Sequence, residues 1–144
     1  MKKPTRADWL LRFIAGSENH DGPVDVIRLM KGMFLFQEEK HAPREVNYKF
    51  RPYDYGPFTA EIYRDAEALE EAGLVFGSAE SKSYRTTGAG RRHLSALDFD
   101  SELEQDLIGL RIEVDELSFR ALLRRVYMAH PKSAERSIAK DVLS

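Results

Sequence analysis

The sequence predicts an α+β, mainly α fold, namely a winged helix-turn-helix-like domain with a two-stranded wing and an appended C-terminal helical hairpin. Three observations lead to this prediction. Apolar residues recur with helical spacing in three successive segments, two short β-type runs flank a polar loop near residue 80, and two further amphipathic helices fill the last third. We expect residues 1–97 to form the winged-helix-like core and residues 98–144 to form a helical extension packed on the same domain.

Two helices are expected first. Thr5 and Asp8 resemble a capping box, with Asp in place of the usual Glu, and Gly16 is suited to end the helix that follows. The second helix lies within residues 24–39, "VDVIRLMKGMFLFQEE". Its apolar residues cover most of the helix surface, which indicates a central helix covered on most sides.

A strand and a third helix are expected next. Residues 45–55, "EVNYKFRPYDY", are rich in aromatic and β-forming types and indicate a short strand that runs into an ordered loop. Gly56 and Pro57 then suit a helix start, because proline at the first helical position loses no needed N–H. The predicted third helix, residues 58–72, takes the recognition-helix position of the fold. Its expected buried side carries Phe58, Ile62, Ala66 and Leu69, and Gly73 ends it.

The wing and the remaining helices complete the order. Residues 74–76 and 84–87 are predicted to pair as a hairpin whose tip spans Ser78 to Ser83, and "GAGRRHLSALD" follows as a fourth helix. Ser101 and Glu104 form a capping box for the fifth helix, and "SFRALLRRVYMAHP" forms the sixth, ended by its proline. Residues 98–116 hold eight acids and one arginine, whereas residues 120–140 hold six bases and one glutamate, giving −7 and +5. Opposite charge is therefore expected to help hold these two helices in register.

Composition narrows the functional classes. The chain has 144 residues, of which 42% are apolar and 32% charged, as in a soluble globular domain. A net charge of −2 gives no overall attraction for phosphate backbones or acidic lipid. The absence of cysteine excludes disulfides and thiolate metal sites, and no apolar run is long enough to cross a membrane. We therefore expect a cytoplasmic protein without a membrane contact.

The sequence offers little for catalysis. The four histidines lie in different segments, and none shows the spacing of a metal site. "TTGAGRR" lacks the Gly-Lys-Ser/Thr of a phosphate loop, and no Ser–His–Asp or Cys–His set can be assembled from spacing. We expect no catalytic residue, no metal and no cofactor, so the chain is predicted not to be an enzyme.

Residues 48–75, "YKFRPYDYGPFTAEIYRDAEALEEAGLV", resemble the signature of the Panacea, or SocA-type, antitoxin domain and of the related YwgA-like bacterial proteins. In these proteins a segment like F-x-P-Y-x-Y-G-P-F-S precedes an amphipathic helix. "IRLMKGMFLFQ" is similar to the second helix of the family, and "LLRRVYMAHPKSAERS" resembles the YwgA-like C-terminal pattern. Gly32 and Thr59 depart from the residues expected there. The resemblance covers most of residues 24–137 and implies a winged-helix-like domain that neutralises a partner protein in toxin–antitoxin or phage-defence settings.

Two hypotheses for function remain open. In the first, a rigid loop set by Pro52, Gly56 and Pro57 presents aromatic residues to a partner protein, a toxin or defence component, as tyrosines do in many binding hot spots. The candidate partner-binding residues are Tyr53, Tyr55, Phe58, Tyr63 and Arg64.

In the second hypothesis the chain is a DNA-binding regulator that contacts double-stranded DNA as a homodimer formed through its C-terminal helices. Its candidate phosphate-binding residues are Lys49, Arg51, Lys82, Arg85, Arg91 and Arg92. The outward positions of the predicted recognition helix are Ala60, Tyr63, Arg64, Glu67, Glu70 and Glu71. Three acids against one base are poorly suited to a helix in the major groove, because each acid that faces phosphate adds repulsion.

Overall fold

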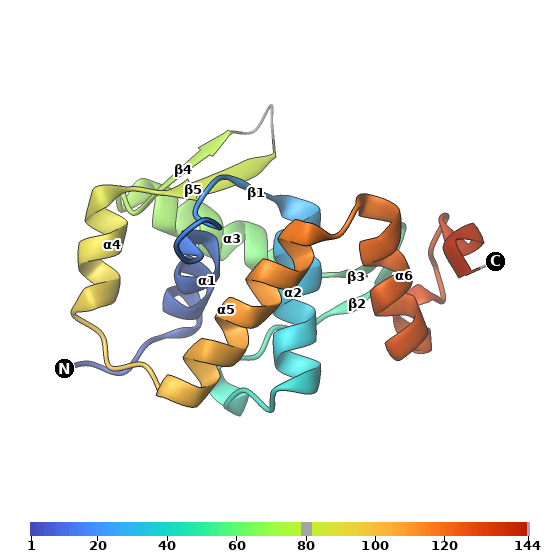
Figure 1. Cartoon of the computed structure of the whole chain (residues 1–144), viewed down its shortest axis with the longest axis horizontal. Helices are drawn as coiled ribbons and strands as arrows, with labels where there is room; N and C mark the ends of the chain where they lie inside the picture. Colours follow the sequence, from blue (N-terminus) through green and yellow to red (C-terminus); the bar gives the residue numbers. More distant parts are fainter. Residues whose placement is uncertain (79–81, 144) are drawn as a thin grey trace.

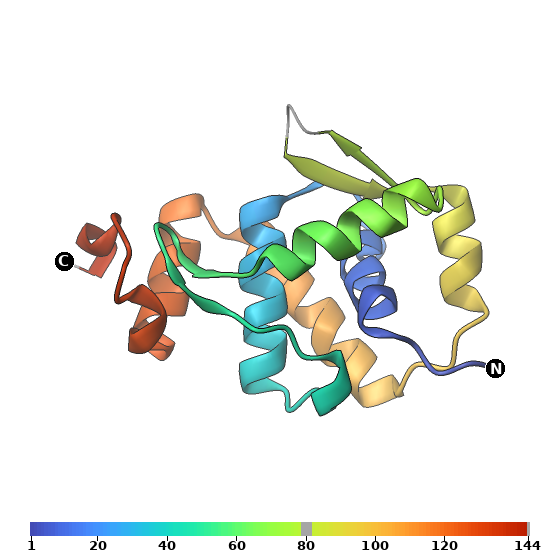
Figure 2. The ribbon, with the colours of Figure 1, turned by 180° about the vertical axis from the view of Figure 1, so that it is seen from behind.

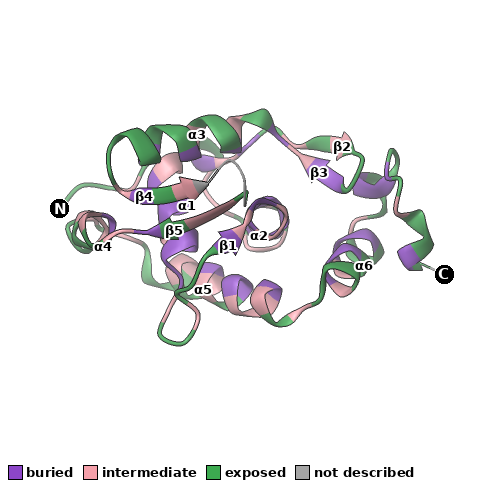
Figure 3. Cartoon of the chain, turned by 90° about the horizontal axis from the view of Figure 1, so that it is seen from above, coloured by how far each residue is buried: buried purple, intermediate pink, exposed green. Residues whose placement is uncertain are grey.

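The second predicted helix forms the centre of the structure. The computed structural model describes residues 1–78 and 82–143, and in it α2 (Val26–Glu39) is surrounded by other elements on most sides (Figures 1 and 3). The helices α1 (Arg6–Ala15), α5 (Ser101–Glu116) and α6 (Phe119–Ala129) all pack against it. Its residues 29–36 are buried without a break, which confirms the predicted central position.

The predicted caps of the first helix are present. The Thr5 hydroxyl accepts a hydrogen bond from the Asp8 amide, and the Asp8 carboxylate accepts one from the Thr5 amide, so the capping box is complete. Gly16 ends the helix with a φ of +67°, a conformation that favours glycine. Asp25 caps α2 in the same manner by accepting from the Arg28 amide.

The wing is present, and it is part of a three-stranded sheet. Strands β4 (Val75–Ser78) and β5 (Ser83–Thr86) pair antiparallel, as predicted, and β1 (Val24–Asp25) joins the other edge of β5. The chain order α1, β1, α2, α3, β4, β5 is that of a winged helix. Residues 79–81 of the predicted wing tip lie outside the described residues.

The predicted start of the third helix is wrong. Residues 56 and 57 do not enter a helix, because β3 (Gly56–Phe58) pairs antiparallel with β2 (Arg51–Tyr53) to form a second hairpin. The helix α3 (Ala60–Glu71) begins later, where the Thr59 hydroxyl accepts a hydrogen bond from the Glu61 amide. Pro52 and Pro57 face each other in this hairpin, which a two-stranded sheet tolerates because each strand is an edge.

The β2–β3 hairpin replaces the short turn of a helix-turn-helix. Such a turn normally has three or four residues, whereas residues 40–59, which include η1 (Arg44–Val46), separate α2 from α3. As a result α3 packs mainly on α1. Its inner side carries the predicted Ile62, Ala66 and Leu69, all buried, and the six positions predicted to face outward are exposed. Figure 3 shows this exposed side along the length of α3.

The C-terminal part packs against the same core. Thr87 caps α4 (Gly88–Ser95) by accepting from the Gly90 amide. The predicted capping box of α5 is wrong, because Asp100 caps this helix by accepting from the Leu103 amide, and Ser101 is the first helical residue. Beyond α6, the short helices η2 (Pro131–Ala134) and η3 (Lys140–Leu143) pack back on it.

Charge contributes less to the arrangement of α5 and α6 than the sequence indicates. Both helices pack on α2, and among the described residues a single ion pair, Glu113 to Arg125 at 2.7 Å, connects them. The other basic residues of α6 point to the C-terminal segment instead. Arg120 pairs with Asp141, and Arg124 donates to the Val142 carbonyl. The two helices are therefore placed chiefly by apolar packing on α2.

Arg111 is a charged residue inside the core, with 1% of its surface exposed. One of its terminal nitrogens donates to the Phe13 and Ile14 carbonyls at 2.8 and 2.7 Å, and the other donates to the Gly22 carbonyl at 2.7 Å. Its Nε donates to the Asp115 carboxylate. The guanidinium thus supplies a donor to the Ile14 carbonyl near the end of α1 and a second donor to the Phe13 carbonyl, which also accepts from the Gly16 amide.

We expect Arg111→Met to lower the free energy of unfolding by about 3–5 kcal/mol, because it removes a buried cation that donates to three main-chain carbonyls and to Asp115, and leaves the Ile14 and Gly22 carbonyls without a donor among the described residues. Urea denaturation followed by circular dichroism measures this change. The matched control is Arg120→Met, which removes an exposed ion pair and should cost less than about 1 kcal/mol. Equal midpoints for the two variants would contradict the structural role of Arg111.

Candidate functional site

The β2–β3 hairpin brings most of the predicted partner-binding residues together. It crosses α2 between α3 and α6 (Figure 2). Successive strand residues point to opposite faces, and the register pairs Arg51 with Phe58 and Pro52 with Pro57. The two prolines therefore face α2 and α6, whereas Arg51, Tyr53 and Phe58 lie on the other face.

The outer face of the hairpin continues onto α3. Ring centroids of Tyr53 and Phe58 are 5.2 Å apart, and those of Phe58 and Tyr63 are 6.1 Å apart. Tyr53 is 47% exposed and Tyr63 39% exposed. Arg51 and Arg64 are exposed beside them in the chain. We call these five residues the aromatic face.

Tyr55 does not belong to this group. It lies in the turn of the hairpin and contacts Phe119 of α6 edge-on, with ring centroids 5.6 Å apart. Both rings are partly exposed. No signal in the sequence points to Phe119 as a neighbour of the loop, because the contact joins segments 64 residues apart.

The base of the hairpin is fixed by hydrogen bonds to α2 and α3. The Gln37 side chain accepts from the Tyr48 amide at 2.7 Å and donates to the Tyr48 carbonyl at 2.9 Å. The buried Tyr48 hydroxyl donates to Asp65 at 2.6 Å, and Arg6 binds Asp65 through two nitrogens. Burial, together with the Asp65 carboxylate, raises the pKa of Tyr48. The segment that leads into the hairpin is therefore firmly attached to α2 and α3.

Glu61 adds a further attachment. Its carboxylate accepts from the Lys49 amide at 2.8 Å and from Arg6 at 3.1 Å. The bond from the Lys49 amide is the main reason why the pKa of Glu61 is lowered, with Arg6 contributing in the same direction. Glu61 and Asp65 of α3 thus point inward and hold the hairpin, while Glu67, Glu70 and Glu71 remain exposed.

The tip of the hairpin is held by the C-terminal segment. The Ile138 amide donates to the Asp54 carbonyl at 2.8 Å. Gly56, at a φ of +91°, lies directly against the Tyr127 ring, which would be 2.7 Å from a Cβ at this position. The Tyr127 hydroxyl in turn bonds Ser137 at 2.6 Å. Both ends of the hairpin are therefore fixed before any partner arrives.

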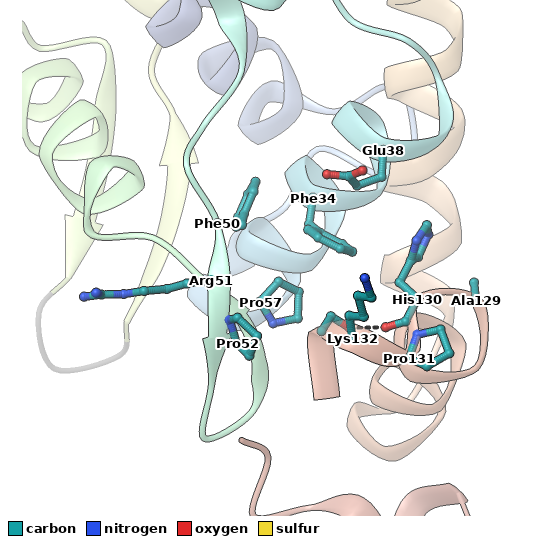
Figure 4. Close-up of a pocket in the computed structure, with 11 residues that line it drawn as sticks. Phe34, Glu38, Phe50, Arg51, Pro52, Pro57, Ala129, His130, Pro131 and Lys132 are labelled. Atoms are coloured by element: carbon teal, nitrogen blue, oxygen red, sulfur yellow. Dashed lines mark hydrogen bonds between the residues drawn. The ribbon is translucent and has the colours of Figure 1, made fainter. Parts of the chain in front are cut away.

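The inner face of the hairpin borders a cleft of about 500 Å³ (Figure 4). We call it the hairpin cleft. Its polar lining comes from Glu38, Arg51, His130, Lys132 and Ser133. Its apolar lining consists of Phe34, Phe50, Pro52, Pro57, Ala129 and Pro131. Sequence reasoning missed this cleft, because the contributing segments are separated in the chain and only the fold joins them.

Glu39 anchors the wall of the cleft formed by the end of α6. It accepts two hydrogen bonds from Arg125, at 2.6 and 3.0 Å, and one of 2.8 Å from the His130 Nε2. The pKa of Glu39 is lowered to about 2, chiefly by the Arg125 hydrogen bonds. These bonds connect the C-terminal end of α2 to that of α6 and fix the orientation of the His130 ring.

Lys31 is buried beneath the hairpin with 4% of its surface exposed. Its ammonium donates to the Pro57 carbonyl at 3.3 Å. Burial lowers the pKa of Lys31 from 10.5 to about 8, and Asp25 only partly opposes this effect. A lysine within the apolar run of α2 was visible in the sequence but was not singled out there.

The predicted DNA-binding residues occupy three separate places. Lys49 and Arg51 lie at the hairpin, Lys82 and Arg85 on the wing, and Arg91 and Arg92 on α4, and all six are exposed. Figure 1 shows the hairpin and α4 on different sides of the molecule.

The wing also stands next to acidic groups of α3. Glu70 lies against β4 at Gly77, and Glu67 and Glu70 both contribute to the raised pKa of Tyr84 in β5, whose main cause is burial. A phosphate bound at the wing would therefore approach these carboxylates.

In the part of the chain that the structure describes, no group of three or more His, Cys, Asp or Glu side chains is placed to hold a metal ion. Within the same residues, no helix combines the length and apolar character needed to cross a membrane.

No family model, no curated protein and no solved structure matches the sequence or the fold.

We expect Lys31→Met to be more stable than the parent chain at pH 7. The pKa of Lys31 falls from 10.5 to about 8 on folding, so the cost of the buried charge is about 3 kcal/mol below pH 8. The lost hydrogen bond to Pro57 offsets about 1 kcal/mol of this, leaving a gain of about 2 kcal/mol. The advantage should shrink between pH 8 and 10, because there only the unfolded parent chain still binds the proton.

Urea titrations at several pH values measure this dependence. Lys49→Met is the matched control, since Lys49 is exposed and its replacement should show no such trend. If the difference between the Lys31 variant and the parent chain is the same at pH 7 and pH 10, the ammonium does not destabilise the fold.

Proposed function

We propose that this chain is a non-catalytic winged-helix interaction module that binds a partner protein through its aromatic face. One observation carries the proposal. Three aromatic rings from the hairpin and α3 contact one another, and two of them, Tyr53 and Tyr63, are exposed around the partly buried Phe58, on a hairpin held at both ends. Tyrosine and arginine are enriched among residues that dominate binding energy, and a prearranged surface loses little entropy when it binds.

The class of partner follows from the resemblance of residues 48–75 to Panacea-type antitoxins. The quoted segment covers the whole hairpin and α3, so the residues that carry the resemblance also form the aromatic face. We therefore propose a toxin or a component of a phage-defence system as the partner. Such a role places the chain in the bacterial cytoplasm.

A regulator that binds DNA is the second candidate. It is favoured by the winged-helix order of the elements and by exposed Lys82 and Arg85 on the wing. Glu67 and Glu70 beside the wing disfavour it, as does the long connection that takes α3 away from α2. In this candidate a homodimer would form through α5 and α6.

The partner hypothesis is tested by co-purification of the full chain from its native cells, followed by titration with the identified protein. Tyr53→Ala and Tyr63→Ala should each weaken binding about 30-fold, as expected for hot-spot residues. Phe76→Ala is the matched control, because Phe76 is an exposed ring on the wing face that points away from α3. Equal losses in all three variants would count against the aromatic face.

Fluorescence anisotropy with duplex DNA separates the two candidates. The interaction module should show no tight binding at low salt. Tight binding that weakens steeply as salt rises, and that is abolished by Lys82→Glu with Arg85→Glu, would overturn the proposal in favour of the regulator.

A further inference from the structure

The hairpin cleft has the construction of a ligand site separate from the aromatic face. Phe34 forms its centre and meets Phe50 and His130 edge-to-face, with ring centroids 5.3 and 5.2 Å apart and interplanar angles of 88° and 86°. The rings of Phe50 and His130 are thus roughly perpendicular to that of Phe34. The prolines of the hairpin and of η2 complete the walls (Figure 4). A volume of about 500 Å³ suits a ligand with one or two fused rings.

A single cation projects into this apolar space. The Lys132 side chain extends toward Phe34 and His130, whereas the Arg51 guanidinium points away from the cleft (Figure 4). Among the described residues no carboxylate forms an ion pair with Lys132, while the His130 imidazole is already bonded to Glu39 at 2.8 Å. The Lys132 ammonium is therefore available to a bound anion.

The carboxylate of Glu38, the other charged group that faces the cleft, limits the ligand to one negative group. Glu38 lines the same space and forms no ion pair with any described residue. A ligand with two or three negative charges would meet this carboxylate as well as the ammonium, and would lose much of its attraction. A planar ring with a single carboxylate avoids that repulsion.

We propose that the hairpin cleft binds a small aromatic monocarboxylate. Its ring lies against Phe34 between Phe50 and His130, and its carboxylate accepts from the Lys132 ammonium. The apolar walls supply most of the affinity, and the single cation selects the charged form of the ligand. This function goes beyond partner binding and does not depend on it, because the cleft and the aromatic face share no residue except Arg51, whose guanidinium points away from the cleft (Figure 4).

Two-dimensional amide NMR of the full chain tests the site, with phenylacetate and indole-3-acetate as probes and their neutral amides as matched ligands. Both carboxylates should give saturable shifts centred on Phe50 and Lys132, with dissociation constants of about 0.1–1 mM for ligands of this size. Each amide should bind about tenfold more weakly, since it lacks the charge that Lys132 recognises.

Variants at two exposed lysines complete the test. Lys132→Gln should remove the preference for the carboxylate and leave the affinity for the amide unchanged, whereas Lys140→Gln in η3 should change neither. Three outcomes would overturn the proposal: shifts that never saturate, equal affinity of the parent chain for acid and amide, or an unchanged preference in Lys132→Gln. The amide spectrum of each variant shows at the same time that it is folded.

Discussion

The buried guanidinium of Arg111 ties α5, which packs on α2 through apolar residues, to the end of α1. By donating to the last carbonyls of α1 and to Gly22, it fixes α5 across the end of α1. Arg28 of α2 closes the C-terminal end of α5, where it donates to the Val114 and Leu117 carbonyls. The chain then turns directly into α6, which forms one wall of the hairpin cleft. The cleft thus depends on two arginines that close helix ends and do not line it.

The hairpin between α2 and α3 gives this winged-helix-like fold two differently built faces on one strand, and we propose a binding role for each. Pro52 and its neighbour Tyr53 point in opposite directions, so a strand of three residues contributes to both the cleft and the aromatic face. The attachments at Tyr48, Asp54 and Gly56 hold both faces in one geometry.

Much of the fold was predictable because its signals are local. Helical periodicity located the six main helices, and the caps at Thr5, Gly16 and Thr87 are satisfied by residues a few positions away. The start of α3 was misjudged because Gly56–Pro57 suits a helix start as well as an edge strand. Thr59, a local cap, distinguishes the two. The site was less predictable from the sequence. Tyr48 is buried because Gln37 and Asp65, neither of which is a sequence neighbour, bind it, whereas Tyr53 has no such partners among the described residues and is exposed.

The acidic residues of α3 distinguish it from the recognition helix of a DNA-binding winged helix. In a helix that binds in the DNA major groove, the outward side needs basic residues and the inward side needs apolar residues. Here two acidic residues of the helix, Glu61 and Asp65, point inward and hold the segment that leads into the hairpin. Three more acids remain on its outer side. The polar residues of α3 position the neighbouring hairpin, which is consistent with a binding surface on the hairpin and not on the helix alone. This use of the helix cannot be inferred from the fold, because the same fold serves many functions.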